Sequence, residues 1–276
     1  MTCGAVSISE YGSLTTKGLL YHYGRCDQCR MIFVVDPVSR EFPAAQDESL
    51  TTNSTLADPS SITARPGHYY LAAALAQYIN SRTDGPQQIL DIGCGKGELS
   101  VLLKRSLGEG SSYLGLDPFL PYARTAAERG VDVLPTTLEA FVEEASDRVP
   151  FDVIVMDNVL EHMPDPGNAI DLAKTLMTPG GAVAIAVPNV HDVRRYLPGR
   201  FNDKYLWIPD THINYFSLAT LKRLVTEHGL VPSLLQAPVR GAPWANKLKW
   251  GSKNLLERWL NLPARGLYVL ARLPSR

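Results

Sequence analysis

The chain has 276 residues, of which 45% are hydrophobic and 20% are charged, and its formal net charge is −1. This length is enough for one well-buried domain with an appendage, and the balanced charge excludes the bulk basicity of a nucleic-acid-binding protein. No apolar run approaches the roughly 20 residues that span a bilayer, and the start of the chain lacks the basic-then-apolar pattern of a signal peptide. We therefore expect a globular, cytoplasmic protein that binds no nucleic acid and has no transmembrane segment.

Residues 1–40 are predicted to form a small β segment that carries three of the four cysteines. Cys26 and Cys29 are separated by two residues, which is the spacing of a zinc knuckle. Cys3 stands like the remaining half of a second knuckle, so this segment resembles a zinc ribbon with one ligand missing, for which His22 is a possible substitute. The alternatives are a Zn²⁺ site at these residues, a metal-free remnant of a ribbon, and a redox pair.

Residues 41–65 are rich in Ser, Thr, Asp and Pro with little apolar periodicity, which is typical of a linker. From residue 66 to residue 276, strand and helix patterns alternate, and this alternation indicates βαβ units built on a parallel sheet. We therefore predict an α/β domain over this part of the chain. The expected strands are Gln88–Ile92, Tyr113–Leu116, Val131–Leu134, Asp152–Met156, Gly181–Val187, Leu230–Gln236 and Gly266–Leu273.

Helices are expected between these strands. Asp165 and Ser217 each stand directly before a helical pattern, so we predict that their side chains cap helices. Thr136 and Glu139 have the three-residue spacing of a capping box, which predicts a further helix start at Thr136.

The sharpest local signal is a glycine loop directly after the first strand of this domain. Gly93, Gly95 and Gly97 stand at alternate positions, and an acid, Asp91, precedes them. Glycines let the backbone turn sharply and approach a ligand closely, and the helix that follows offers unpaired N–H groups. A dinucleotide fingerprint is G-x-G-x-x-G, whereas here the third glycine comes one residue early. The loop therefore favours a nucleotide ligand without a pyrophosphate.

Four later segments extend this pattern: FDVIVMDNVLEHMPDP at 151–166, MTPGG at 177–181, VPN at 187–189 and HINYFS at 212–217. With the glycine loop, they resemble the class I S-adenosylmethionine (SAM)-dependent methyltransferases over roughly residues 69–272. The resemblance implies a doubly wound, Rossmann-like sheet of seven strands, mostly parallel, with the last strand antiparallel. It also implies that SAM is the cofactor and that a small molecule accepts the methyl group.

The resemblance also assigns cofactor-binding roles to particular residues. Relatives often carry an acid near Thr137 that holds the adenine amino group, whereas here only Thr137 or backbone groups can serve. Taken alone, Cys94 is a small packing residue of the loop, and Asp117 before Pro118 is more typical of a turn than of a ribose ligand. The implied positions are Asp91, Gly93, Cys94, Gly95 and Gly97 near the methionine moiety, Asp117 and Pro118 on the ribose, Thr137 and Leu138 beside adenine, and Asp157 and Asn158 on the methyl-bearing side.

Two histidines are the candidate catalytic residues. Methyl transfer from a sulfonium is an in-line displacement, so the protein must align the acceptor and exclude water. For a hydroxyl acceptor, a positioned base adds roughly 10²- to 10⁴-fold to the rate. His162 and His212 follow the strands at whose ends the acceptor faces the sulfonium, and Asp210 is placed to orient His212. The alternatives are that His212 holds the insertion to the sheet and that His162, with Glu161, orients its loop.

Residues 190–216 form an insertion that we expect to act as an acceptor lid. Aromatic faces with interleaved cations suit a sugar ring, a phosphorylated or carboxylated metabolite, or an aromatic acceptor. The alternative is ordinary packing of an insertion with a solvated basic face. The aromatic and cationic residues are Arg194, Arg195, Tyr196, Arg200, Phe201, Lys204, Tyr205 and Trp207.

We therefore predict a SAM-dependent O-methyltransferase whose leading acceptor is a hydroxyl of a saccharide or a glycosylated natural product. Two rival functions remain: a catalytically silent SAM-binding partner subunit and a nicotinamide-dependent oxidoreductase. The expected partners are the small-molecule acceptor and, as an open alternative, a second copy of the chain in a homodimer.

Overall fold

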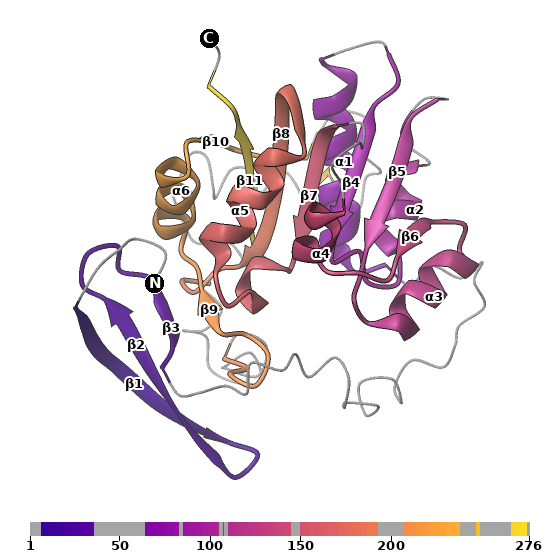
Figure 1. Cartoon of the computed structure of the whole chain (residues 1–276). Helices are drawn as coiled ribbons and strands as arrows, with labels where there is room; N and C mark the ends of the chain where they lie inside the picture. Colours follow the sequence, from indigo (N-terminus) through magenta and orange to yellow (C-terminus); the bar gives the residue numbers. More distant parts are fainter. Residues whose placement is uncertain are drawn as a thin grey trace.

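The computed structural model describes residues 7–35, 64–82, 85–104, 107, 110–144, 150–192, 207–237, 247–248 and 266–274. In Figure 1 these residues form a large twisted sheet with helices on both faces and a smaller, mostly N-terminal sheet at the lower left. Most of the predicted linker 41–65 lies outside the described residues. Within the described ranges, no helix is both long enough and apolar enough to cross a membrane.

The large sheet contains all seven predicted strands. Their order is β10-β11-β8-β7-β4-β5-β6, and neighbours are parallel except at β11, which is antiparallel to β10 and β8. This confirms the predicted α/β fold with its doubly wound, mostly parallel sheet. The strands are β4 (Gln88–Ile92), β5 (Ser112–Leu116), β6 (Asp132–Leu134), β7 (Phe151–Asp157), β8 (Met177–Pro188), β10 (Val231–Leu234) and β11 (Gly266–Arg272).

The chain reverses its direction of travel across the sheet beside β4. From β4 it continues through β5 to the edge at β6, and it then returns to the other side of β4 at β7. Open α/β sheets bind their ligands at such a switch point, outside the carboxyl ends of the strands. The segments that follow Ile92 and Asp157 are therefore the place to look for a site.

Helices cover both faces of this sheet and bury the core between them (Figure 1). Strand β8 shows the division: Ala182, Ala184 and Ala186 pack with α1, whereas Val183 and Ile185 pack with α5 and α6. Small side chains on the first face let the long, alanine-rich α1 lie close to the sheet. The helices are α1 (Pro66–Asn80), α2 (Glu98–Lys104), α3 (Leu120–Glu128), α4 (Leu138–Glu143), α5 (Pro166–Thr175) and α6 (Leu218–Glu227).

Two of the predicted helix caps are confirmed. Asp165 Oδ1 accepts hydrogen bonds from the N–H groups of Gly167 and Asn168, each at 3.0 Å, at the start of α5. Ser217 Oγ accepts the N–H of Thr220 at 3.1 Å at the start of α6. Both side chains satisfy backbone donors that the first turn of a helix leaves unpaired.

The predicted capping box at Thr136 and Glu139 is wrong by one residue. Thr136 belongs to the turn after β6, because its N–H donates to the Leu134 oxygen at 2.9 Å. Helix α4 begins after Thr137, whose Oγ1 accepts the Ala140 N–H at 3.3 Å. Two adjacent threonines satisfy the same cap preference, so the local pattern could not choose between them.

The smaller sheet contains three N-terminal strands and one strand from the end of the 190–216 insertion. Its order is β1-β2-β3-β9, with every pair antiparallel. Strand β9 was not predicted: Tyr215 pairs with Ile32 and Asn214 pairs with Phe33. The end of the 190–216 insertion is therefore built into the N-terminal sheet. The strands are β1 (Ile8–Thr16), β2 (Leu19–Cys26), β3 (Ile32–Val34) and β9 (Asn214–Tyr215).

Candidate active site at the switch point

The glycine loop adopts a backbone that side chains would obstruct. Gly93, Gly95 and Gly97 have φ values of +67°, +57° and +77°, a region that disfavours other residues. A Cβ on Gly93 would lie 2.6 Å from Cγ2 of Val159, so this glycine permits close packing against the segment after β7. A Cβ on Gly95 would meet nothing within 4 Å. The backbone at Gly95 therefore faces open space, where a ligand can approach it.

Asp117, at the end of β5, is bonded directly to this loop. Its Oδ2 accepts the Gly95 N–H at 2.8 Å, and its Oδ1 accepts the Phe119 N–H at 2.9 Å. Burial raises the pKa of Asp117, although the two N–H groups act in the opposite direction. The carboxylate is therefore both a turn residue, as its Asp-Pro sequence indicated, and part of the predicted cofactor site. Pro118 follows it and is exposed.

Asp91 is a buried acid that is only half satisfied. It is 1% exposed, and its Oδ2 accepts the Tyr113 hydroxyl proton at 2.5 Å. Its Oδ1 is buried without a hydrogen-bond partner among the described residues. Burial raises the pKa of Asp91 to about 8; the Tyr113 hydrogen bond opposes this shift, and the charges of Asp157 and Asp117 add to it. A buried carboxylate oxygen without a partner is costly and indicates a place for a hydrogen-bond donor.

The side chains of Cys94 and Leu138, two of the predicted cofactor residues, are buried in the protein, whereas that of Thr137 is exposed. Cys94 is 7% exposed, and its sulfur fills the space over Gly115, where a Cβ would lie 2.6 Å from it. Burial raises the pKa of the Cys94 thiol far above its ordinary value, which fits the alternative of a packing residue. Thr137 caps α4, and Leu138 is 2% exposed in the core. The 137–138 turn can therefore offer a ligand its backbone groups and the exposed hydroxyl of Thr137.

Asp157 is the last residue of β7, at the other side of the switch point, and Asn158 follows it. Asn158 has a φ of +56°, and its side-chain Nδ2 donates to Asp157 Oδ1 at 2.8 Å. On the other oxygen, Nε2 of His68 lies 3.3 Å from Asp157 Oδ2. Burial raises the pKa of Asp157 to about 6, and burial lowers that of His68 to about 4, so His68 is neutral near pH 7.

His68 was missed by the sequence analysis. It lies in the first turn of α1, is 8% exposed, and its Nδ1 is buried without a partner among the described residues. The one available signal was a histidine at a buried position of an otherwise apolar helix. That signal is weak, because interior histidines commonly bond to the backbone instead.

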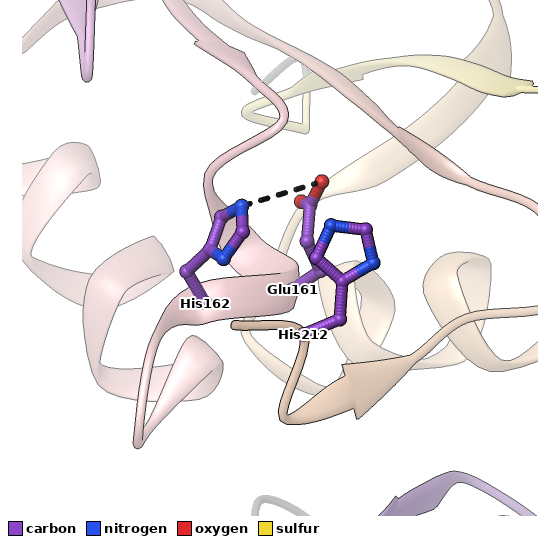
Figure 2. A group of neighbouring side chains, drawn as sticks. All are labelled: Glu161, His162 and His212. Atoms are coloured by element: carbon purple, nitrogen blue, oxygen red, sulfur yellow. Dashed lines mark ion pairs between the residues drawn. The ribbon is translucent and has the colours of Figure 1, made fainter. Parts of the chain in front are cut away.

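The two predicted catalytic histidines come together with Glu161, as Figure 2 shows. Glu161 and His162 belong to a 3₁₀ turn, η3 (Leu160–His162), while His212 approaches from the segment that leads to β9. The rings of His162 and His212 are 4.9 Å apart in an edge-to-face arrangement. Glu161 Oε1 lies 3.9 Å from His162 Nε2. Distant parts of the sequence thus place two imidazoles and a carboxylate beside one another.

Glu161 is the less satisfied member of this cluster. It is 1% exposed, and neither of its buried carboxylate oxygens has a hydrogen-bond partner among the described residues; the 3.9 Å contact with His162 is too long for a hydrogen bond. Burial raises the pKa of Glu161 to about 8, and the nearby Asp157 charge acts in the same direction. For His162, burial lowers the pKa, while the bond to Thr211 opposes this shift. The sequence analysis had treated Glu161 as a loop-orienting residue only.

Hydrogen bonds clamp the His212 segment onto η3. His162 Nδ1 lies 2.7 Å from the Thr211 oxygen; a carbonyl only accepts, so Nδ1 carries the proton. The Ile213 N–H donates to the backbone carbonyl oxygen of Glu161 at 2.9 Å, and Asn214 Nδ2 donates to the backbone carbonyl oxygen of Met163 at 2.6 Å. These contacts also fit the alternative that His212 helps to hold the insertion to the sheet.

Asp210, which we expected to orient His212, pairs with the N-terminal hairpin. Its Oδ2 lies 2.6 Å from Lys17 Nζ. Nearby, the ring of Trp207 stacks on Tyr215 with centroids 4.6 Å apart and meets the edge of Tyr23 at 5.0 Å. Trp207 therefore packs the end of the lid against the small sheet. The other predicted lid residues, Arg194, Arg195, Tyr196, Arg200, Phe201, Lys204 and Tyr205, lie outside the described residues.

The N-terminal cysteines are seen in part. The Cys29 N–H donates to Cys26 Sγ at 3.4 Å, and Cys26 is buried. His22 lies on β2 and is exposed, whereas Cys3 lies outside the described residues. A zinc site at Cys3, Cys26 and Cys29 therefore stays a prediction.

Comparisons with known proteins agree with this geometry. The methyltransferase domain family matches residues 64–233, which is more than half of the chain. The chain is 32% identical over 176 residues to the ubiquinone biosynthesis O-methyltransferase of Aeromonas salmonicida, covering 60% of this chain and 71% of that protein. This chain is a class I SAM-dependent methyltransferase. The predicted family, enzyme class and cofactor are thereby confirmed.

Three further proteins resemble this methyltransferase, either over a smaller share of their own length or at lower sequence identity. The Actinobacillus pleuropneumoniae serotype 5b ubiquinone biosynthesis O-methyltransferase is 34% identical over 122 residues, and the chain spans only 51% of its length (41% of this chain). The plantazolicin methyltransferase BpumL in complex with SAH has a TM-score of 0.54 at 16% identity, covering 74% of this chain and 83% of that one. A SAM-dependent methyltransferase from Archaeoglobus fulgidus has a TM-score of 0.51 at 19% identity, covering 73% and 92%. These structures support the fold.

Proposed function

We propose that this methyltransferase transfers the methyl group of SAM to a hydroxyl oxygen of a small-molecule acceptor. The observation that carries the proposal is the position of His162 and His212. Their rings lie together, and the η3 turn that carries His162 and the glycine loop both follow the carboxyl ends of strands of the large sheet. Oxygen as the methylated atom is supported by the names of the Aeromonas and Actinobacillus relatives, both of which are O-methyltransferases.

The residues at the switch point fit SAM. The unpaired, buried Oδ1 of Asp91 suits the ammonium group of the methionine moiety, and the buried Asp117 has lone pairs for the ribose hydroxyls. The open space at Gly95 admits a ligand against bare backbone. Several buried acids also suit a cofactor that carries positive charge. We therefore assign Asp91, Gly93, Gly95, Gly97 and Asp117 to cofactor binding, with Cys94, Pro118, Thr137 and Leu138 contributing backbone.

On the acceptor side, the chain's own groups orient the reaction. SAM supplies a methyl group on a positively charged sulfur. Asp157 and Asn158, held by His68, are assigned to the wall beside that methyl group, where a negative carboxylate opposes a positive charge. The main contribution of the protein to the rate is to align the acceptor oxygen with the methyl group beside these residues.

His162 and His212 are proposed to make the acceptor hydroxyl nucleophilic. Because the Nδ1 proton of His162 is committed to the Thr211 oxygen, its Nε2 has a free lone pair whenever the ring is neutral. Burial lowers the pKa of His162, which keeps the ring neutral near pH 7. A neutral imidazole nitrogen is a group that can accept the proton of an acceptor hydroxyl.

The class of acceptor is the finer part of this proposal. A saccharide or glycosylated hydroxyl is the acceptor predicted from the aromatic and cationic composition of the lid. The names of the relatives favour a second candidate, a precursor in quinone biosynthesis. Both are small molecules that present hydroxyl groups, so the same site residues apply to either.

One experiment tests the function and separates these acceptors. The purified chain is incubated with methyl-labelled SAM and fractionated extract of its source cells, and labelled products are identified by mass spectrometry. We expect a labelled O-methyl ether on a small molecule. A label on protein, on nucleic acid or on a nitrogen atom would overturn the proposal, and so would failure of the chain to bind S-adenosylhomocysteine in calorimetry.

A further inference from the structure

The cluster of Glu161, His162 and His212 has the composition of a metal site. Each residue offers one ligand atom, and these three atoms all lie within 4.8 Å of one another. Two imidazole nitrogens with one carboxylate form the ligand set of several catalytic zinc sites, in which a fourth position stays open for water or substrate. This set is distinct from the predicted zinc ligands Cys3, Cys26 and Cys29.

A second observation independently points to a cation here. Both side-chain oxygens of Glu161 are buried and accept no hydrogen bond in the described parts of the chain; Oε1 has only the 3.9 Å ion-pair contact with His162 Nε2. A buried carboxylate without hydrogen bonds is unfavourable unless a proton, a cation or a metal ion satisfies it. Figure 2 shows the carboxylate lying between the two imidazole rings, which is where such an ion would be shared.

The surroundings of His162 prepare it to be a ligand. Metal-binding histidines usually donate their second ring N–H to a carbonyl or carboxylate, which fixes the tautomer and aims the other nitrogen at the ion. His162 does this through Nδ1, at 2.7 Å from the Thr211 oxygen, and its Nε2 is the atom 3.9 Å from Glu161 Oε1. The hydrogen bond from the Ile213 N–H to the backbone carbonyl oxygen of Glu161 holds the His212 segment against η3. Hydrogen bonds to the backbone therefore position the cluster before any ion binds.

We propose that Glu161, His162 and His212 bind one divalent first-row transition-metal ion of the zinc type, with an open position toward the acceptor. Imidazole ligands favour such ions over Mg²⁺ and Ca²⁺, which prefer all-oxygen sites. This inference rests on the proposed function in one respect, the role of the ion. A hydroxyl bound at the open position becomes more acidic and loses its proton to solvent. Its oxygen then forms the O–C bond as the S–C bond of SAM breaks, leaving a neutral thioether.

Cobalt absorption tests the site without an acceptor. The full chain carrying Cys3→Ser, Cys26→Ser and Cys29→Ser is stripped with a chelator and titrated with Co²⁺, so that the predicted cysteine site cannot contribute. We expect one equivalent to bind with visible d–d bands and no sulfur charge-transfer band. Zn²⁺ should displace it, and Mg²⁺ at the same concentration should not.

Matched variants then locate the ion. Glu161→Gln keeps the shape of the side chain and should weaken Co²⁺ binding by more than the roughly 10- to 100-fold typical of outer-shell changes. His212→Ala should do the same. His228→Ala, which alters a histidine–carboxylate pair elsewhere on the surface, should leave the spectrum unchanged. Each variant is checked for S-adenosylhomocysteine affinity, and should His212→Ala lose it, Glu161→Gln decides.

The outcomes separate the metal from the function. No bound Co²⁺, or binding that Glu161→Gln and His212→Ala leave intact, overturns the metal site while S-adenosylhomocysteine binding leaves the methyltransferase proposal standing. A cobalt spectrum of the expected form in a chain that transfers methyl groups to nitrogen would uphold the metal site and overturn O-methylation.

Discussion

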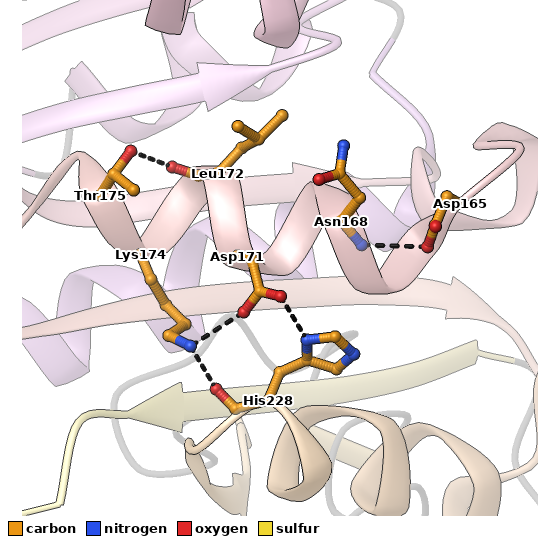
Figure 3. A network of polar contacts seen from close by, with 7 residues as sticks. All are labelled: Asp165, Asn168, Asp171, Leu172, Lys174, Thr175 and His228. Atoms are coloured by element: carbon orange, nitrogen blue, oxygen red, sulfur yellow. Dashed lines mark hydrogen bonds and ion pairs between the residues drawn. The ribbon is translucent and has the colours of Figure 1, made fainter. Parts of the chain in front are cut away.

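Two histidine–carboxylate groups in this protein differ in how fully their polar atoms are paired. In the first, Glu161 is buried beside His162 and His212, and neither side-chain oxygen has a hydrogen-bond partner among the described residues. In the second, shown in Figure 3, Asp171 accepts from Lys174 Nζ at 2.9 Å and lies 2.8 Å from His228 Nδ1.

The second group is a complete, half-exposed network. Lys174 also donates to the His228 oxygen at 2.6 Å, which ties the end of α6 to α5. The Asp171 side chain is 50% exposed, whereas that of Glu161 is 2% exposed. Exposed, fully paired charges add little to stability and need no ligand. The two groups share residue types and differ in burial and in hydrogen bonding, and this difference is the basis for proposing a site at the first group only.

The largest expected difference between the two groups is in turnover. His212→Ala should lower methyl transfer by roughly 10²- to 10⁴-fold, because the acceptor hydroxyl is no longer activated. His228→Ala should leave it unchanged. The measurement is transfer of label from SAM into the small-molecule fraction of extract, with S-adenosylhomocysteine affinity as a check that each variant folds. Equal loss in both variants would remove His212 from the active site.

The second-largest expected effect is on cofactor affinity, and it concerns Asp117 at the glycine loop, not either histidine–carboxylate group. Asp117→Ala removes a carboxylate that bonds the Gly95 N–H and is assigned to the ribose. Losing hydrogen bonds to a charged group costs about 3 kcal/mol, or roughly 100-fold in affinity for S-adenosylhomocysteine. Calorimetry measures this, and Asp171→Asn serves as the control with wild-type affinity. Unchanged binding in Asp117→Ala would show that Asp117 is only a turn residue.

The two carboxylates should give stability opposite dependences on pH. For Glu161, the pKa in the folded state is raised from 4.5 to about 8, so its contribution is present below pH 4.5 and is lost as the pH rises to about 8. Glu161→Gln should therefore flatten the decline of stability between pH 5 and 8, a window set by those two pKa values. Urea unfolding of metal-free wild type and variant across this range measures it. Parallel curves would show that Glu161 is not buried as a carboxyl group.

For Asp171, the net direction is the reverse. Burial raises its pKa, but the hydrogen bonds from Lys174 and His228 outweigh burial and lower it. Its stabilising contribution is therefore present above its unfolded pKa and is lost as the pH falls through its folded pKa. Because the side chain is half exposed, Asp171→Asn should lower stability by less than about 1 kcal/mol at pH 7. If urea unfolding showed a loss of unfolding free energy several times larger than this, the Asp171 network would contribute more to stability than its exposure predicts.

Much of the fold could be predicted from local pattern. Apolar strands such as Gln88–Ile92 and the caps Asp165 and Ser217 lie where expected, because periodicity and capping act over a few neighbouring residues. Strand β9 could not be predicted. It is a two-residue strand whose hydrogen bonds are made with Ile32 and Phe33, far away in the chain.

The site divides in the same way. The glycine loop and Asp117 could be found because their spacing to a strand end is a local feature. Glu161 and His68 gave no comparable signal, since a buried acid and a surface acid have the same letter in a sequence. Their importance comes from burial and from missing partners, which depend on how β7, α1 and the His212 segment pack.

The sequence by itself determined the positions of the seven strands along the chain, the glycine turn and the acids at the strand ends, because backbone conformation and amphipathic periodicity are set by adjacent residues. Only the tertiary structure decided that Lys17 meets Asp210, that β9 joins the N-terminal sheet, and that Glu161 lies buried beside His162 and His212. The reason is that desolvation and contact arise from segments that approach one another only after the chain has folded.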